Sequence, residues 1–442
     1  MTGFANDRPV CAWYGDDFTG TLAVLEIFAF AGFSGAAYLK MPTPDEMLRF
    51  EGLDVIGLAG TARAQSPEWM DVNLPTIYRW LAATDAEIVA YKACSTLDSA
   101  PEVGSIGRAA ELGLTAFSQS SVDCVIACPS MGRYQVFGNL FATGPDGAVH
   151  RLDRHPVMTR HPVTPMHEAD VARHLAAQTT LQTVNAHSAT TRPAIDGIIC
   201  CDAYDAADME RTGAAIWAGR QQRRFVIGSQ GVQVALAAHF RKNGMLAPPS
   251  APPQPEPRPT VVISGSVSPT TAAQIEHALA HGFEGIRIQP EELLPGSTEA
   301  AAQRAAARAR AILDRGRLPI IFSATGPDDP AVAAFGELVR QQGFTLPQAQ
   351  EHLGEALGQV ARVVLAETGL ARAVIAGGDT SGRIMTALGG LAVTALYPGN
   401  TPGTSLFRLA ADNELDGLEV ALKGGQMGSV DVFRRLAGQK VL

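Results

Sequence analysis

The feature that most constrains the fold of this chain is a repeated alternation between short apolar runs and amphipathic segments. The apolar runs, six to eight residues long, are predicted to be buried strands at Val10–Gly15, Leu53–Gly60, Ala86–Lys92, Asp123–Ser130, Ile195–Cys201, Arg223–Ser229, Thr260–Ser266, Leu318–Ala324, Ala371–Gly378 and Leu418–Gly425. Helices are expected between them, among them Leu22–Ala31, Val232–Arg241 and Ser297–Arg315, the last with a cap at each end. Such alternation predicts an α/β protein whose mainly parallel sheets are flanked by helices.

A proline-rich stretch divides the alternating pattern into two parts. Residues 247–259 contain seven prolines in thirteen residues, a density that favours an extended, semi-rigid spacer. We therefore predict two domains, residues 1–246 and 260–442, joined by a linker at 247–259. The alternative is a long surface loop within a single domain.

The charge balance excludes some partners. The 442 residues carry a formal net charge of −9 and only five lysines, with no basic run. An acidic chain of this kind is a poor nucleic-acid binder, so no nucleic-acid partner is expected.

Cysteine usage and hydropathy indicate a reduced, cytoplasmic protein without a membrane partner. The six cysteines follow no disulfide framework and no zinc spacing. The first ten residues lack the order of a signal peptide, and the longest candidate membrane stretch, Ile384–Tyr397, is too short to span a bilayer.

In parallel sheets ligands bind beyond the carboxyl ends of the strands, so the residues that follow each run matter most. Asp16 and Asp17 follow the first run, where adjacent carboxylates suit polyol binding, metal binding or general-base catalysis. The alternative is an aspartate that caps the next helix beside a solvated neighbour. Arg63 follows the second run, and Lys92 closes the third and leads to Asp98. Arg63 is suited to hold a carboxylate, although an ordinary surface arginine is the simpler reading, and Lys92 is either a site cation or a snorkelling lysine.

The second half carries a different chemistry at its strand ends. Three turns rich in small residues each follow a predicted strand and are each expected to open a helix: Ser264–Pro269, Gly377–Gly382 and Gly424–Gly428. Small residues let backbone N–H groups approach a phosphate, and a helix amino terminus adds partial positive charge. None is a Walker A loop or a GxGxxG fingerprint, and one such turn alone is often only structural. Three together favour a polyphosphate ligand, and the two halves together suggest a small-molecule kinase.

Several motifs resemble those of a known family. Tyr14–Gly20, YGDDFTG, is similar to the (A/G)DD(L/F)TG signature of the four-carbon acid sugar kinases, formerly a domain of unknown function. Gly377–Gly382, GGDTSG, resembles that family's GG(D/E)TSG motif, and Lys423–Gly428 resembles its K(S/G)GNFG motif, with Gln426 and Met427 in place of Asn and Phe. The resemblance spans nearly the whole chain, including Met131–Arg133 and His161–Met166.

The resemblance implies ATP-dependent phosphorylation of a sugar-acid hydroxyl, usually the terminal one, with the acid held by the first domain and ATP by the second. Carried over by motif, the sugar-acid site would comprise Asp16, Asp17, Arg63, Lys92 and Asp98. The ATP site would comprise Ser266, Gly377, Gly378, Asp379, Thr380, Ser381, Gly382 and Gly425.

The expected reaction is in-line transfer of the γ-phosphoryl group of Mg·ATP, with Mg²⁺ as cofactor. In this scheme Arg63 or Lys92 holds the substrate carboxylate and Asp17 is the candidate general base. Asp379 is expected to contact the metal ion, its waters or the nucleotide, and no residue is assigned as a direct metal ligand. The formation of homo-oligomers is left open.

The motifs around Lys92 indicate a substrate class but leave two candidate acids open. Residues 92–99, KACSTLDS, are similar to the CST(F)DS variant of the 3-oxo-tetronate kinase branch, which predicts a 3-oxo-tetronate, threonate or erythronate. Residues 101–107 differ from that branch's usual continuation, so a branched oxo acid of the isoapionate type is the alternative. More remote alternatives are a non-catalytic sugar-acid sensor and a nicotinamide-dependent dehydrogenase.

Overall fold

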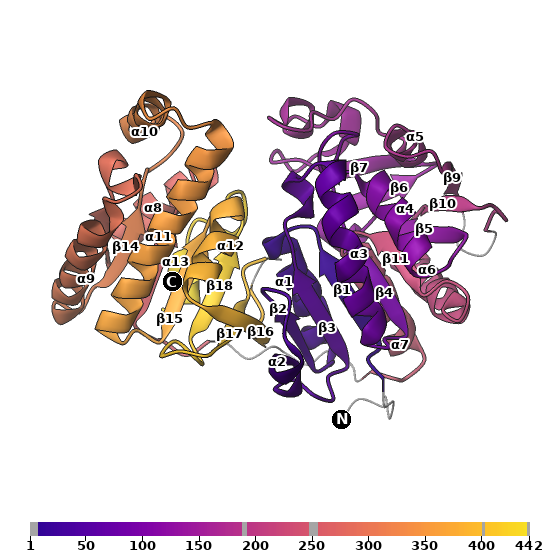
Figure 1. Ribbon diagram of the computed structural model, residues 1–442, viewed down its shortest axis with the longest axis horizontal. Coiled ribbons are helices and arrows are strands. Elements are labelled where there is room, and N and C mark those ends of the chain that lie inside the picture. Colours follow the sequence, from indigo (N-terminus) through magenta and orange to yellow (C-terminus); the bar gives the residue numbers. More distant parts are fainter. Residues whose placement is uncertain (1–7, 188–191, 247–254, 400–402, 440–442) are drawn as a thin grey trace. The chain divides into compact units, whose positions relative to one another are not determined.

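The computed structural model of this protein describes residues 8–187, 192–246, 255–399 and 403–439. The chain forms two compact units, Met1–Ser250 and Ala251–Leu442 (Figure 1). Residues 247–254 lie outside the description, so the linker proposed for 247–259 stays a prediction.

A parallel sheet forms the centre of the first unit. Its strands lie in the order β2-β3-β1-β4-β11-β5-β10-β9, and every described pairing among them is parallel. The strands are β1 (Cys11–Gly15), β2 (Gly35–Tyr38), β3 (Val55–Ala59), β4 (Ile88–Lys92), β5 (Ser121–Val125), β9 (Gln182–Ala186), β10 (Gly197–Cys201) and β11 (Phe225–Gly228).

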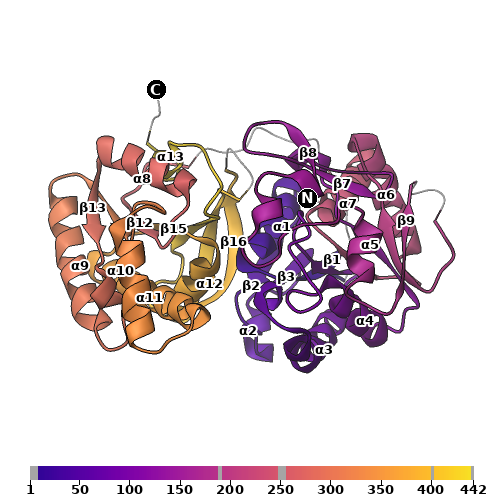
Figure 2. The ribbon, with the colours of Figure 1, turned by 90° about the horizontal axis from the view of Figure 1, so that it is seen from above.

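Helices cover both faces of this sheet (Figure 2). One face carries α1 (Phe18–Ala31), α6 (Ala206–Gly219) and α7 (Gly231–Lys242), and the other carries α3 (Pro67–Ala83) and α4 (Ile106–Ala116). The unit also contains α2 (Pro44–Leu48), α5 (Val171–Ala176), and the short 3₁₀ helices η1 (Ala62–Ala64), η2 (Pro129–Met131), η3 (Leu152–Arg154) and η4 (Met158–Arg160). A small antiparallel sheet follows β5 and consists of β6 (Arg133–Val136), β7 (Asn139–Thr143) and β8 (Val149–Arg151).

The second unit has its own sheet, in the order β13-β14-β12-β15-β18-β17-β16. Its pairings are parallel from β13 to β18 and antiparallel among β18, β17 and β16. The strands are β12 (Thr260–Ser264), β13 (Phe283–Arg287), β14 (Leu318–Phe322), β15 (Arg372–Ala376), β16 (Gly390–Tyr397), β17 (Leu406–Ala411) and β18 (Glu419–Lys423).

Two helix layers sandwich this second sheet. Figure 2 shows α8 (Pro269–Ala280) and α13 (Val432–Leu436) on one face, with α9 (Thr298–Asp314), α11 (Leu346–Thr368) and α12 (Gly378–Ala387) on the other. The 3₁₀ helix η5 (Pro290–Leu293) and the helix α10 (Pro330–Gln341) follow strands β13 and β14. None of the helices in the described ranges is both long and apolar enough to cross a membrane.

The predicted fold class is confirmed. Nine of the ten predicted apolar runs contain a strand, and the tenth, Asp123–Ser130, overlaps only the end of β5. The strands that were not predicted include the edge strands β9 and β13, whose partly exposed residues give no continuous apolar run. The prediction of a side-chain cap at Ser297 is wrong, because that residue has helical backbone angles and its hydroxyl accepts no capping bond. At the other end of the same helix Gly316 has φ +70°, as expected of a glycine beyond a helix end.

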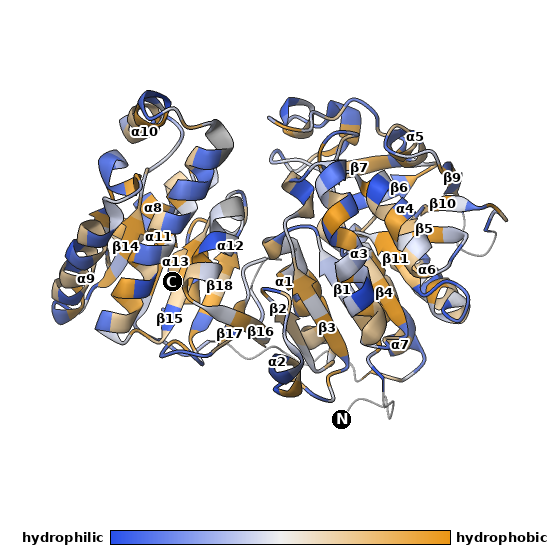
Figure 3. Ribbon diagram, in the orientation of Figure 1, coloured by the Kyte–Doolittle hydropathy of each residue, from blue (hydrophilic) through white to orange (hydrophobic). Residues whose placement is uncertain are grey.

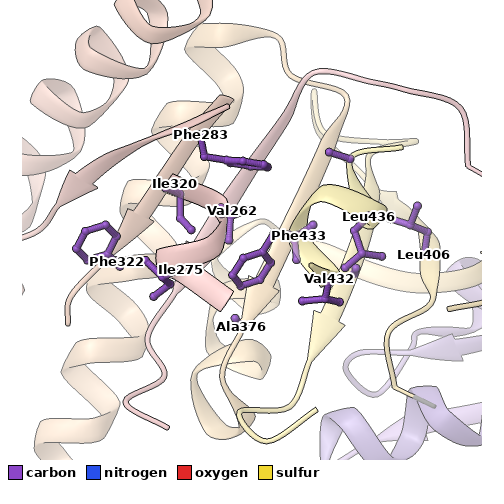
Figure 4. Packing of buried hydrophobic residues seen from close by; sticks show 14 residues of the cluster. Val262, Ile275, Phe283, Ile320, Phe322, Ala376, Leu406, Val432, Phe433 and Leu436 are labelled. Carbon is purple, nitrogen blue, oxygen red and sulfur yellow. The ribbon is translucent and has the colours of Figure 1, made fainter. Parts of the chain in front are cut away.

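Apolar residues concentrate on the strands and on the helix faces that cover them (Figure 3). In the second unit Ile275 of α8 and Phe433 and Leu436 of α13 pack over Val262 and Ile320 of the sheet (Figure 4). The burial of this cluster fixes the strand ends at which the proposed ligand-binding turns begin.

A buried ion pair links the first residues of two neighbouring strands in the second unit. Arg372 and Glu419 are in register, and the guanidinium Nε and Nη2 lie 2.7 and 2.6 Å from Glu419 Oε2. Arg372 Nη1 also donates to the carbonyls of Glu256 and Leu436, at 3.0 and 2.9 Å. One side chain therefore holds the chain segment before β12 and the end of α13 against the sheet.

Arg372→Met is expected to lower the free energy of unfolding by about 3 kcal/mol, because it leaves the buried Glu419 with only the longer, more exposed pair to Arg258 at 3.5 Å. Urea unfolding followed by circular dichroism measures this change. Arg315→Met removes the exposed pair with Glu284 and should cost less than about 1 kcal/mol. Equal effects of the two substitutions would contradict the structural role of Arg372.

Candidate active site

The polar residues of the first unit meet because their strands are parallel and in register. Gly15 at the end of β1 pairs with Ala59 of β3 on one side and with Lys92 of β4 on the other. The residues that follow these strands therefore emerge at one edge of the sheet, as predicted from the sequence. Two backbone bonds fix the arrangement, from Asp16 N to the Lys92 carbonyl and from Arg63 N to the Asp16 carbonyl, both 3.0 Å.

Arg63 bridges the two adjacent carboxylates. Its Nε and Nη2 donate to Asp16 Oδ2 and Oδ1 at 3.2 and 2.6 Å, and Nη2 also donates to Asp17 Oδ1 at 2.7 Å. Asp17 caps α1 as well, since Oδ1 accepts from Gly20 N at 3.1 Å, and Thr19 Oγ1 donates to Oδ2 at 2.6 Å. Asp17 therefore caps α1, which was one of the two readings of the sequence, and its role in binding substrate stays a prediction.

The two carboxylates differ in access and in charge. Their side chains are 2% exposed at Asp16 and 24% exposed at Asp17. Burial raises the pKa of Asp16, although Arg63 opposes the shift. Burial acts in the same direction on Asp17, but the charges of Arg63 and Lys92 and two hydrogen bonds outweigh it and lower its pKa. Asp17 is thus the more accessible carboxylate and the one whose ionised form is favoured, and the prediction that both carboxylates bind substrate stays untested.

Lys92 is a buried cation with no hydrogen bond or ion pair to any residue that the structure describes. A Cβ atom on Gly20 would lie 2.6 Å from Lys92 Nζ and 2.2 Å from Asp17 Oδ1. The glycine in the sequence GDDFTG therefore leaves the space in which the ammonium approaches the carboxylate. The burial of Lys92 contradicts the snorkelling alternative, and its role as a site cation stays a prediction.

Asp98 lies in the turn that follows β4, the strand that ends at Lys92. Its carboxylate accepts from Thr164 Oγ1, and His161 Nδ1 lies 3.8 Å from Asp98 Oδ1. Thr164 and His161 belong to the His- and Pro-rich segment between β8 and α5, which thus packs against the predicted site.

Sequence reasoning missed Arg133 as a site residue, although its motif was noticed. The guanidinium is largely buried, its Nη1 donates only to the Met131 and Gly132 carbonyls, and its buried Nε has no partner among the described residues. Burial lowers the pKa of Arg133, and no carboxylate in the described chain opposes this. Burial raises the pKa of the Cys128 thiol, and the charges of Arg133 and Lys92 oppose the shift. Cys94 is likewise within electrostatic range of Arg63 and Arg133.

In the second unit a cavity of about 670 Å³ opens at the carboxyl ends of the strands, and it is within the usual size range of small-ligand sites. One end is lined by the predicted residues Ser266, Gly377, Gly378 and Thr380, together with Gln426. Two of the three predicted turns open helices, with Ser268 as the cap of α8 and Gly377 as the cap of α12. The Thr380 hydroxyl is buried and has no partner in the described chain, so it is available to a ligand.

The third turn does not open a helix, because α13 begins only at Val432, and that prediction is corrected. Instead Lys423, fully buried at the end of β18, folds the turn around its ammonium group. Lys423 Nζ donates to the carbonyls of Gly424, Met427 and Gly425 at 2.9, 3.2 and 3.4 Å, and burial lowers its pKa to about 8. Gly425 lies against Ser266, since a Cβ there would be 2.9 Å from Ser266 Oγ.

The other predicted nucleotide residues differ in their surroundings. The buried Ser381 donates to the Gly377 carbonyl and so stabilises the first turn of α12, and Gly382 lies inside that helix. The side chain of Asp379 lies outside the described residues, so its predicted contacts remain untested. Ser381, Gly382 and Gly425 are not among the described residues that line the cavity.

The other end of the cavity is apolar and was not predicted from the sequence. Phe335 and Val339 of α10, Phe344 of the following loop and Leu353 of α11 line it, with Leu293 of η5. Only helical periodicity in 330–341 signals this surface, and nothing in the sequence indicates that it faces a ligand. A cavity of this kind fits a nucleotide. The base would occupy the apolar end, and the phosphates would occupy the end formed by the turns of small residues.

The described cavity lining contains no carboxylate, and no cluster of three metal-ligating side chains occurs among the described residues. The predicted contact of Asp379 with a metal ion or its waters therefore stays a prediction.

Family models match both units. A sugar-binding N-terminal domain matches residues 11–236, and a nucleotide-binding C-terminal domain matches residues 261–433. The chain belongs to the four-carbon acid sugar kinase family.

Relatives over nearly the full length agree with this class. The chain is 42% identical to a 3-oxo-isoapionate kinase of Paraburkholderia graminis, over 97% of this chain and 95% of the relative. It is 30% identical to a 3-oxo-tetronate kinase of Cupriavidus necator and 28% identical to one of Pseudomonas fluorescens, each over 98% of both chains. This protein is accordingly an ATP-dependent sugar-acid kinase, and the sensor and dehydrogenase alternatives are set aside.

Two crystal structures share the fold. A Salmonella typhimurium protein described as a tRNA synthase superposes with a TM-score of 0.76 at 23% identity, covering 96% of this chain and 98% of that one. A Haemophilus influenzae protein gives a TM-score of 0.70 at 22% identity, covering 97% and 99%.

Gly378→Ala is expected to leave stability unchanged and to weaken binding of a non-hydrolysable ATP analogue by more than about tenfold, because a Cβ there meets no atom within 4 Å and would occupy the open cavity. Gly377→Ala is the matched contrast. With φ +145° and a Cβ 2.2 Å from Thr380 Oγ1, it should lower stability as well. Thermal unfolding and isothermal titration measure both effects. Unchanged affinity in Gly378→Ala would contradict a phosphate site at this turn.

Proposed function

We propose that this kinase phosphorylates the terminal hydroxyl of a branched oxo sugar acid of the 3-oxo-isoapionate type. The observation that carries the proposal is the 42% identity to a 3-oxo-isoapionate kinase over 97% of the chain, against 30% or less for the reported 3-oxo-tetronate kinases. The departure of residues 101–107 from the tetronate branch supports it.

Within the first unit, Lys92 and Arg133 would hold the carboxylate of the acid. Lys92 is buried and Arg133 is partly buried, and Arg133 has no carboxylate partner among the described residues. A guanidinium binds a carboxylate through two parallel hydrogen bonds, and Arg133 Nε is a donor without a partner. Arg63, predicted from the sequence as a carboxylate clamp, is instead engaged by Asp16 and Asp17 and would act by holding Asp17 in place.

Asp17 and Asp98 would accept hydrogen bonds from the hydroxyls of the acid. Asp17 remains the candidate general base, because it is the accessible member of the pair and a kinase aspartate accepts the proton of the attacking hydroxyl. Its lowered pKa makes it a weak base, which is compatible with a loose transition state in which the proton leaves late.

In the second unit, ATP would lie with its base among Phe335, Phe344 and Leu353 and its phosphates at Ser266, Gly377 and Gly378. The amino termini of α8 and α12 and the Thr380 hydroxyl would bind the phosphates. Mg²⁺, when bound with ATP, would neutralise the charge that develops on the transferred phosphoryl group.

A 3-oxo-tetronate is the second candidate substrate, favoured by the KACSTLDS sequence at residues 92–99. The two acids differ in the substituent that the branched one carries. A pocket that accommodates one extra carbon substituent typically discriminates about 10–200-fold.

ADP release coupled to NADH oxidation, measured with purified enzyme and a panel of acids, tests this proposal. We expect kcat/KM for 3-oxo-isoapionate to exceed that for 3-oxo-tetronates about 10–100-fold. Asp17→Asn is the control for contaminating ATPase activity and should lose the signal with every acid. Preference for a tetronate would overturn the branched substrate, and no release with any acid would overturn the substrate class.

A further inference from the structure

A second layer of polar residues lies behind the turn that carries Asp98 in the first unit. Ser99, His174 and Gln178 form this cluster, which contacts no residue of the proposed sugar-acid site other than the turn itself. Ser99 and Gln178 are buried, His174 is partly buried on α5, and Gln178 follows that helix. None of the three is assigned a role above.

The hydrogen bonds of Gln178 determine which atoms donate in this cluster. Gln178 Oε1 accepts from Ile106 N and Gly107 N at 2.8 and 3.2 Å, so the amide orientation is fixed. The opposite end of the amide is then the NH₂ group, which lies 2.9 Å from His174 Nε2 and 3.0 Å from Ser99 Oγ. An NH₂ group only donates, so His174 Nε2 is an acceptor and the imidazole is neutral. Burial, which lowers the pKa of His174 to about 4, favours the same state.

With both Gln178 protons assigned, the Ser99 hydroxyl proton is directed away from His174. Ser99 Oγ donates to the Leu97 carbonyl at 3.1 Å. Leu97 has φ +53°, a left-handed conformation that is costly for a leucine and persists only where neighbours hold it. The chain of bonds from His174 through Gln178 and Ser99 thus fixes the residues on both sides of Asp98.

We infer that His174 is a positioning residue for Asp98 and, through it, for the sugar acid. The inference rests on the proposed function in one respect, namely that Asp98 binds a hydroxyl of the acid. His174 accepts one proton of the Gln178 NH₂ group and leaves the Ser99 hydroxyl to donate to Leu97, and this bond holds the left-handed turn that directs the Asp98 carboxylate. Gln178 additionally stabilises the amino terminus of α4, so Gln178 has a structural role that His174 lacks.

His174→Phe retains the ring and removes the acceptor, whereas His174→Gln supplies an amide oxygen that can accept the same bond. Steady-state kinetics with the sugar acid and ATP varied separately measure the effect. We expect His174→Phe to raise KM for the acid about tenfold, with KM for ATP unchanged, and His174→Gln to recover most of the loss. If His174→Phe does not fold, Ser99→Ala tests the same link from the other side and should give the same selective increase.

Asp98→Asn, made alone and combined with His174→Phe, separates failure of this inference from failure of the proposed function. We expect Asp98→Asn to raise KM for the acid and the double variant to be no worse than Asp98→Asn. An unchanged KM in Asp98→Asn would overturn the assignment of Asp98. The positioning role would be overturned if Asp98→Asn raised KM for the acid and His174→Phe did not, or if the effects of the two substitutions were fully additive in the double variant. It would also be overturned if His174→Phe changed KM for the acid and KM for ATP equally, or if His174→Gln recovered none of the loss.

Discussion

The fork of hydrogen bonds from Arg63 to Asp16 and Asp17 is the interaction on which the first site depends. Two adjacent carboxylates at a buried strand end would repel each other and lose hydration, and a planar guanidinium that reaches both offsets these costs. The fork also separates their roles, since it leaves Asp16 buried and Asp17 partly exposed. The contacts with Arg63, Thr19 and the start of α1 hold the Asp17 carboxylate in place and favour its ionised form.

The two proposed sites use different groups to bind anions. The first gathers side-chain cations, Lys92 and Arg133, at the edge of its sheet and leaves them without carboxylate partners among the described residues. The second relies on backbone N–H groups, hydroxyls and helix amino termini, and its one strand-end lysine, Lys423, is used to fold a turn. This difference suits a carboxylate of fixed charge in one site and a polyphosphate accompanied by its own metal ion in the other.

Much of this arrangement could be predicted from the sequence, because buried parallel strands read as apolar runs and their carboxyl ends share one edge. That logic brought Asp16, Arg63 and Lys92 together correctly, and it identified the turns at Ser266 and Gly377. It could not show that Arg63 is occupied by two aspartates, because pairing of side chains 46 and 47 residues apart depends on rotamers. Edge strands such as β13 were missed because their residues are partly exposed and form no continuous apolar run. The apolar surface of α10 was missed because an apolar helix face that lines a cavity has the same sequence pattern as one that packs against the core. Arg133 was missed as a candidate site residue because a guanidinium without a carboxylate partner can be recognised only when the residues around it are known.

The central claim is that the first unit keeps buried cations ready for the carboxylate of a sugar acid. Isothermal titration of Arg133→Met with 3-oxo-isoapionate, alongside its thermal unfolding, tests it most directly. The account predicts an affinity loss of more than about tenfold with little change in the unfolding temperature, because the substitution removes a partly desolvated charge without a carboxylate partner and with it only the hydrogen bonds to the Met131 and Gly132 carbonyls. Undiminished affinity, or an unfolding temperature that falls together with the affinity, would contradict it.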